Sequence, residues 1–201
     1  MSTQDTVPAC QTALLLLDLQ NEMVDPAGKI GSGGLAAVVA QRGVVDKAAN
    51  ALAAARARGN AVAHVRLGFR ADYADALSVA PRIARLKEHK AAILGTWGTE
   101  FPAPLAPVGG ELVITKQCVN PFYNTGLMNW LLHKGIKHVV LSGVVTNLVV
   151  EATARAADDA GFAVTVLEDA CAAPNQEWHD FSTQKILPLF ANISSTEAFV
   201  A

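Results

Sequence analysis

The sequence predicts an α/β protein in which a mainly parallel, six-stranded sheet lies between two layers of helices, a three-layer αβα arrangement. Three observations support this fold class. Several short runs are apolar throughout, as in strands that helices cover on both faces. Stretches with helical patterns separate most of these runs, which is the alternation of a doubly wound, Rossmann-like sheet. Glycines such as Gly135 and Gly161 follow the helical stretches and are typical helix stops.

The order of elements follows from these patterns. In chain order we expect a leucine-rich strand in the segment 13–20 that ends at Asp18, an alanine-rich helix at 35–58, a strand at 61–67, a less regular stretch at 68–107, a strand at 111–116, a helix at 125–134, a strand at 138–144, a helix at 148–160, a strand at 163–169, a helix at 177–187 and a short strand at 192–195. Residues 1–201 are expected to form a single domain, with 1–11 as a short loose N-terminal segment.

Composition excludes several classes of partner. Hydrophobic residues make up 51 % of the chain and charged residues 17 %, with a net charge of −2 and no run of Lys or Arg. Nucleic acid is therefore not an expected partner. No apolar stretch approaches the roughly 20 residues of a bilayer span, and the start has no signal-peptide pattern, so a cytoplasmic location is expected. Three dispersed cysteines indicate neither a disulfide framework nor a zinc cluster.

Charged residues stand at the ends of two predicted strands. Ligands of doubly wound sheets bind outside the carboxyl ends of the strands. Asp18 ends a run of four leucines and Lys116 ends the segment VITK, so together they form a candidate acid/base pair. Taken singly, Asp18 also fits a helix cap and Lys116 a solvated side chain. A third strand end, the turn at 143–149, presents helix N-terminal amides suited to an oxyanion, although its spacing alone favours an ordinary turn.

Three ordered blocks carry a family resemblance. They are LLLLDLQNEMV, VITKQCVNPFYNTGL, and SGVVTNLVVEATARAADDAGF followed by VTVLEDACAA. Together they resemble the isochorismatase-like (cysteine hydrolase) superfamily over residues 12–197. That superfamily includes nicotinamidases, N-carbamoylsarcosine and ureidoacrylate amidases, and isochorismatases. The resemblance implies the predicted fold and a hydrolase acting on a small molecule.

The resemblance also implies roles for particular residues. Asp18 and Lys116 match the catalytic aspartate and lysine, Val145 and the residue at 149 would supply oxyanion-hole amides, and a cis peptide is expected between Val144 and Val145. The departure is Val149, which stands where amidase members carry the nucleophilic cysteine. Valine has no nucleophilic atom, so an acyl-enzyme cannot form there.

Three functions remain open at this point. The first is a hydrolase that uses Asp18 and Lys116 without a cysteine nucleophile and cleaves an enol ether of the isochorismate type. Asp18 would then act as an acid, or alternatively as a base that activates water. The second is an amidase-related C–N hydrolase acting on a ureido or carbamoyl compound through activated water. The third is a non-catalytic member that serves as a binding module.

Further residues are candidates for substrate contacts. They are Gln20, Asn21, Trp97, Phe122, Tyr123, Thr146 and Asn147, each of which also fits a purely structural role, and Arg66 and Arg70 as partners for a substrate carboxylate. His64 has no aspartate two residues before it, unlike the metal-site pattern of nicotinamidases, so neither a metal nor another cofactor is expected. The resemblance implies a homo-oligomer, either a dimer or a tetramer.

Overall fold

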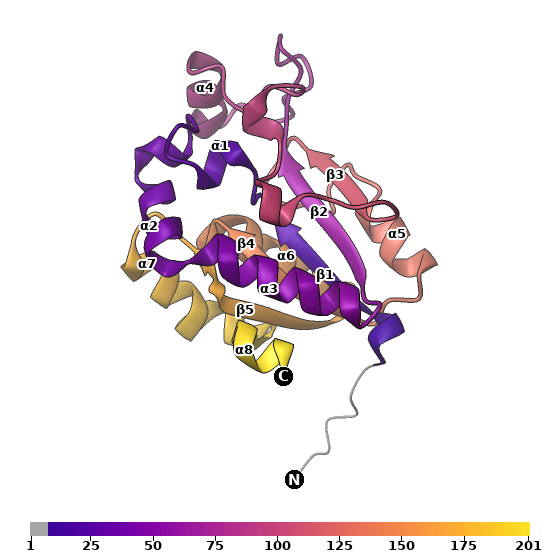
Figure 1. The fold of residues 1–201 in the computed structure, drawn as a ribbon. Coiled ribbons are helices and arrows are strands. Elements are labelled where there is room, and N and C mark those ends of the chain that lie inside the picture. The colour runs from indigo at the N-terminus through magenta and orange to yellow at the C-terminus, as the bar shows by residue number, and fades with distance from the viewer. Residues whose placement is uncertain (1–7) are drawn as a thin grey trace.

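A computed structural model describes residues 8–201 and contains one six-stranded sheet (Figure 1). The strand order is β3-β2-β1-β4-β5-β6, and all paired strands are parallel. The strands are β1 (Thr12–Leu17), β2 (Ala61–Leu67), β3 (Leu112–Lys116), β4 (His138–Val144), β5 (Ala163–Ala172) and β6 (Asn192–Ser194). The predicted fold class is confirmed. The strand order reverses between β1 and β4, which is where doubly wound sheets bind ligands.

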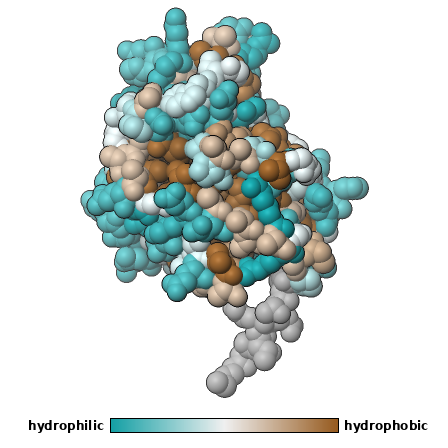
Figure 2. Space-filling model, viewed as in Figure 1, coloured by the Kyte–Doolittle hydropathy of each residue, from teal (hydrophilic) through white to brown (hydrophobic). Residues whose placement is uncertain are grey.

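The helices form two layers over this sheet. They are α1 (Asn21–Val24), α2 (Leu35–Arg42), α3 (Val44–Ala57), α4 (Pro81–Glu88), α5 (Leu127–His133), α6 (Glu151–Asp159), α7 (Gln176–Phe181) and α8 (Thr196–Val200). In Figure 1, α3 crosses one face of the sheet, while α4 lies beyond the ends toward which the strands point. Hydrophobic residues gather in the middle of the face shown in Figure 2, within a hydrophilic frame.

Alternate residues of β1 supply both halves of the core. Leu14 and Leu16 pack with residues of α2 and α3, whereas Ala13, Leu15 and Leu17 pack with residues of α5 and α6. All five side chains are fully buried. Complete burial on both faces explains why the run is apolar throughout, and it leaves the end of the strand as the place for a polar group.

Two helical predictions need correction. The helix expected at 35–58 is interrupted at Gly43, whose φ of 63° lies in the left-handed region that ends α2 and begins α3. The helix expected at 177–187 is α-helical only through Phe181 and continues as a π turn (Ser182–Ile186) and a 3₁₀ turn (Leu187–Leu189).

Smaller differences concern boundaries. The helix expected at 125–134 is shorter in the structure, and the one expected at 148–160 begins as a π turn (Thr146–Val150) before α6. The fifth strand runs three residues beyond its predicted end at 169. Three helices, α1, α4 and α8, were not predicted.

The N-terminal prediction falls partly outside the described residues. Residues 1–7 lie outside them. Ala9–Gln11, by contrast, form a 3₁₀ turn that is tied to the domain, because the Asn60 side chain donates to the Ala9 carbonyl at 2.9 Å and the Lys137 amide to the Gln11 carbonyl at 2.8 Å. Among residues 8–201, no helix combines the length and hydrophobicity that a bilayer crossing requires.

Candidate active site

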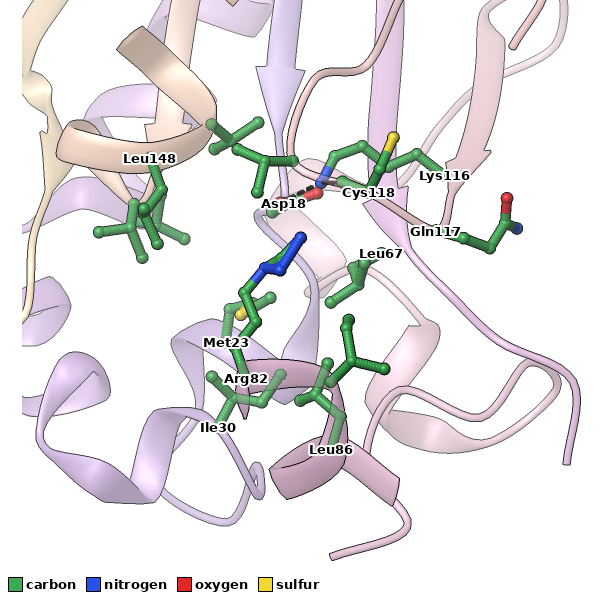
Figure 3. Close-up of a pocket in the computed structure, with 15 residues that line it drawn as sticks. Asp18, Met23, Ile30, Leu67, Arg82, Leu86, Lys116, Gln117, Cys118 and Leu148 are labelled. Atoms are coloured by element: carbon green, nitrogen blue, oxygen red, sulfur yellow. Dashed lines mark hydrogen bonds and ion pairs between the residues drawn. The ribbon is translucent and has the colours of Figure 1, made fainter. Parts of the chain in front are cut away.

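Asp18 and Lys116 meet at the carboxyl ends of the strands. Asp18 follows β1 directly, and its φ of 54° lies in the left-handed region, which Asp adopts more readily than most residues. Lys116 ends β3, two strands away, and its side chain reaches past the end of β2. The Lys116 Nζ atom donates a hydrogen bond to Asp18 Oδ2 at 2.8 Å (Figure 3). A second hydrogen bond, from Nζ to the Cys118 carbonyl at 3.0 Å, holds the ammonium in place.

The two oxygens of Asp18 differ in their surroundings. Oδ2 accepts from Lys116, whereas Oδ1 is buried and has no hydrogen-bond partner among the described residues. Burial raises the pKa of the Asp18 carboxyl, and the charge and hydrogen bond of Lys116 oppose that shift without cancelling it. The protonated form of Asp18 is therefore more favoured than in a free aspartate. Oδ1 is the oxygen that can carry the proton, because Oδ2 already accepts a hydrogen bond from Lys116.

The turn after β4 forms the adjacent wall. The Val144–Val145 peptide bond is cis, and the π turn follows it. Val149 lies in this turn with 2 % of its side chain exposed, and its carbonyl accepts a hydrogen bond from the Thr153 hydroxyl at 2.6 Å. Gly143 packs so closely on β1 that an added Cβ would lie 2.1 Å from the Leu17 carbonyl oxygen. The last residue of β1 and the end of β4 are thus in direct contact, immediately before Asp18.

A cavity of about 180 Å³ lies between these elements. Most of its lining is apolar. The lining residues are Asp18, Met23, Ile30, Leu67, Arg82, Ile83, Leu86, Lys116, Gln117, Cys118, Val119, Val144, Val145, Leu148 and Val149. The structure therefore brings Asp18, Lys116, Val145 and Val149 together at one cavity.

Gln20 and Asn21 lie close to Asp18 in sequence but do not line the cavity. The fully buried Gln20 side chain accepts from the Leu67 amide at 2.7 Å and donates to the carbonyls of Leu67 and Gly98. The Asn21 side chain donates to the Trp97 carbonyl at 3.0 Å. Both amides join the chain after β1 to the segment that follows α4, so their contacts are structural.

The other predicted contact residues also lie outside the cavity lining. Trp97 and Tyr123 are 46 % and 63 % exposed, and Phe122 packs against the core beneath α5 and α6. The Thr146 hydroxyl is 2.9 Å from His179 Nδ1, behind the turn. Asn147 borders a separate shallow depression beside α7.

The arginine that reaches the cavity is Arg82, which sequence reasoning missed. It is on α4, within the stretch predicted to be irregular, so no pattern signalled its direction. The two arginines singled out earlier are held elsewhere. Arg66 donates to the Thr115 hydroxyl and the Thr99 carbonyl, and Arg70 pairs with Asp72 at 3.2 Å.

The cysteines do not supply an obvious substitute for the absent thiol. Cys118 lines the cavity, but its Sγ atom donates to the Asn120 carbonyl at 3.2 Å, and burial raises its pKa. Burial raises the pKa of Cys171 to about 12, so this thiol stays protonated. Over the described part of the chain, no group of three or more His, Cys, Asp or Glu side chains is arranged to hold a metal ion.

Comparisons with known proteins agree with this architecture. The isochorismatase domain family matches residues 12–198. The uncharacterized isochorismatase family protein YecD of Escherichia coli O157:H7 is 35 % identical over 189 residues, which cover 92 % of this chain and 93 % of that protein. The ureidoacrylate amidohydrolase RutB of Variovorax paradoxus is 32 % identical over 174 residues, which cover 81 % and 69 %.

A solved structure supports the same assignment. An isochorismatase family protein from Desulfovibrio vulgaris superposes with a TM-score of 0.82 and 28 % identity, over 94 % of this chain and 95 % of that one. The chain therefore belongs to the isochorismatase family, and it is a hydrolase of that superfamily.

Proposed function

We propose that this protein hydrolyses a small molecule through Asp18 and Lys116 without a covalent intermediate, and that the bond cleaved is the C–O bond of an enol ether of the isochorismate type. The observation that carries the proposal is the state of Asp18. Its carboxyl group is buried, has a raised pKa and keeps one oxygen without a protein partner. A buried carboxyl group with a raised pKa and one unpaired oxygen can act as a general acid while Lys116 holds its other oxygen.

In the proposed reaction, Asp18 donates the proton on Oδ1 to the terminal carbon of the enol ether. The resulting oxocarbenium ion takes up water, and the hemiketal that forms collapses to an alcohol and a carbonyl compound. The proton lost by the water returns to Asp18, so the net change is the addition of one water molecule. Lys116 fixes the carboxyl group through Oδ2, so the proposal assigns the transferred proton to Oδ1, which has no partner among the described residues.

Val149 supports a noncovalent route. It occupies the position at which the resemblance expects the nucleophilic cysteine, and its side chain closes part of the cavity wall. An aliphatic side chain cannot attack a carbonyl carbon, so acyl transfer through this position is excluded chemically. Cleavage by protonation needs no nucleophilic side chain.

The similarity to a ureidoacrylate amidohydrolase favours a second candidate. In that case the substrate is a ureido or carbamoyl compound, Asp18 acts as a base in its ionised form, and the activated water attacks the carbonyl carbon directly. Ammonia release separates the two candidates, because cleavage of an enol ether yields none. A panel of enol ethers and ureido, carbamoyl and nicotinamide compounds, assayed for carbonyl products and for ammonia, tests both.

The pH profile tests the role of Asp18. An acid must hold its proton, so the rate is highest below the pKa of Asp18 and falls as the pH rises through that value. A base gives the opposite slope. D18N should lower turnover by about 100-fold or more, with D72N as the exposed control. A rate that rises with pH, or a D18N variant that retains activity, contradicts the acid mechanism.

V149A tests the noncovalent route, because a side chain that only lines the wall can be shortened with a modest change in rate. Equal losses in V149A and D18N would count against the proposal.

The third possibility, a binding module, is supported if no compound of the panel is turned over. The homo-oligomer and the cytoplasmic location stay predictions.

A further inference from the structure

One polar side chain ties the turn after β4 to a distant part of the fold. Residues in the segment 144–149 line the cavity beside Asp18, so the position of this turn shapes that wall. Of the side chains at 146–150, Thr146 is the one that forms a hydrogen bond with another residue of the described part of the chain. Its Oγ1 atom is 2.9 Å from His179 Nδ1 on α7.

Both members of this hydrogen bond are buried. Thr146 is 0 % exposed and His179 is 2 % exposed. Neither group can therefore exchange its partner for a water molecule, and loss of one partner would leave the other buried without a hydrogen bond. The contact is thus a fixed connection between α7 and the turn that forms the cavity wall.

The partners of the second ring nitrogen determine which way the first one acts. His179 Nε2 is 2.9 Å from Arg42 Nη2 and 3.2 Å from Glu168 Oε2. A guanidinium group can only donate, so Nε2 accepts from Arg42 and the ring proton is on Nδ1. Burial lowers the pKa of His179 and the charge of Arg42 lowers it further, while Glu168 and Asp180 oppose the shift. The neutral ring therefore donates from Nδ1 to Thr146 Oγ1.

Arg42 is itself held firmly at the end of α2. Its Nε atom donates to the Cys171 carbonyl at 3.1 Å, and its Nη2 atom donates to the Glu168 carbonyl at 3.2 Å. Both carbonyls lie where the pairing of β5 with β4 shifts register. Arg42 thus connects α2, the irregular part of β5 and His179, and α2 and α7 lie side by side (Figure 1).

We propose that His179 is a positioning residue for the cavity, which holds the turn after β4 in place through Thr146 and so fixes the wall that faces Asp18. This inference rests on the proposed function, because the reaction is assigned to the same cavity. His179 does not line the cavity, so it acts through Thr146 alone. A site in which the reacting groups must be held in place requires support of this kind from residues outside the cavity.

Two amide substitutions separate the two nitrogens of the ring. The side-chain amide of asparagine lies near the place of Nδ1, whereas that of glutamine lies near the place of Nε2. H179N therefore keeps a donor for Thr146, and H179Q keeps a partner for Arg42 but loses Thr146. At the other end of the hydrogen bond, T146S keeps the hydroxyl and T146V removes it. We expect H179Q and T146V to share one defect that H179N and T146S do not have.

Hydrogen exchange measured by NMR detects this defect without any need for turnover. The amides of Leu148 and Val150 donate to the Val145 carbonyl at 3.0 and 3.4 Å, so their exchange rates report on the turn. H179Q and T146V should each raise these rates at least about tenfold, whereas H179N and T146S should stay within about threefold of the wild type. The double variant should resemble the single ones, because all three lack the same hydrogen bond.

N175A is the matched control, because it weakens α7 without touching Thr146. The Asn175 side chain caps this helix by accepting from the Trp178 amide at 2.9 Å. N175A should raise exchange in α7 and leave the turn unchanged. The proposal is overturned if N175A and H179Q raise exchange in the turn equally, or if T146V leaves it unchanged. Thermal unfolding establishes that each variant is folded, and if H179Q does not fold, the comparison of T146V with T146S decides.

Turnover of an enol ether separates this inference from the proposed function. H179Q and T146V should lower kcat about tenfold and change KM less than about threefold, because alignment is lost while the binding surface remains. If the exchange pattern is as expected but the wild type cleaves no enol ether, His179 positions the turn and the proposed reaction is wrong. If enol ethers are cleaved and both variants keep the wild-type kcat, the reaction stands and the assignment of His179 falls.

Discussion

Replacement of Gly143 by alanine should destabilise the protein severely at the junction that supports the site. Gly143 has a φ of 146°, a conformation that only glycine adopts readily. An added Cβ would lie 2.1 Å from the Leu17 carbonyl oxygen and 2.8 Å from the Leu17 Cβ. Leu17 is paired with Gly143 across β1 and β4, so neither partner can move away without disturbing the centre of the sheet.

The expected cost combines two effects. A residue with a side chain in a sparsely populated backbone region costs about 1–3 kcal/mol. Overpacking in a close-packed interior adds about 1–3 kcal/mol. G143A should therefore lower the free energy of unfolding by about 4 kcal/mol. That loss is a large fraction of the stability of about 5–15 kcal/mol that is typical of globular proteins.

Urea unfolding followed by circular dichroism measures this loss. The matched control is G109A, because Gly109 is exposed and an added Cβ there meets no atom within 4 Å. G109A should stay within about 1 kcal/mol of the wild type. The reasoning is refuted if G143A also stays within about 1 kcal/mol of the wild type. If G143A fails to accumulate in folded form while G109A folds, the loss of stability is at least as large as expected and the reasoning is supported.

Three further predictions concern other parts of the molecule. Burial favours a raised pKa for Glu111, but hydrogen bonds from Arg56, the Val108 amide and His64 outweigh it and lower the pKa to about 2. The free energy of unfolding should therefore fall as the pH drops from about 5 to about 2. In urea unfolding, E111Q should remove about 1–2 kcal/mol of that pH-dependent change. Q20A leaves the buried Leu67 amide without its acceptor and should cost about 2–4 kcal/mol, also by urea unfolding. V149C should gain ammonia release from carbamoyl compounds; no gain would mean that more than the thiol is missing for amidase chemistry.

The sheet was predictable because a strand buried on both faces consists of apolar residues throughout, which is visible in the sequence. A strand such as β1 has no exposed face, so polar residues are confined to its ends. Parallel pairing then brings those ends to one edge, which is why Asp18 and Lys116 could be paired although they are 98 residues apart. Val149 followed from the family resemblance rather than from any pattern.

The features that were not predicted depend on backbone conformation and side-chain direction, which local sequence does not encode. A glycine in an alanine-rich stretch is compatible with a helix, and only the left-handed backbone at Gly43 ends it. Gln20 follows Asp18 closely, but the turn into α1 aims its amide at backbone groups instead of the cavity. Arg82 belongs to a stretch without periodic pattern, so its convergence on Asp18 arises from the packing of α4.

Two separate parts of the chain line the cavity, and this division has a consequence for how ligand preference can change. The ends of β1 and β3 hold Asp18 and Lys116, while α4, in the long connection from β2 to β3, contributes Arg82 and its apolar neighbours. The lining that α4 contributes can therefore be changed by exchanging this one connection, with Asp18 and Lys116 left untouched. Exchanging the connection from β2 to β3 between relatives is a direct way to alter which compounds the cavity accepts.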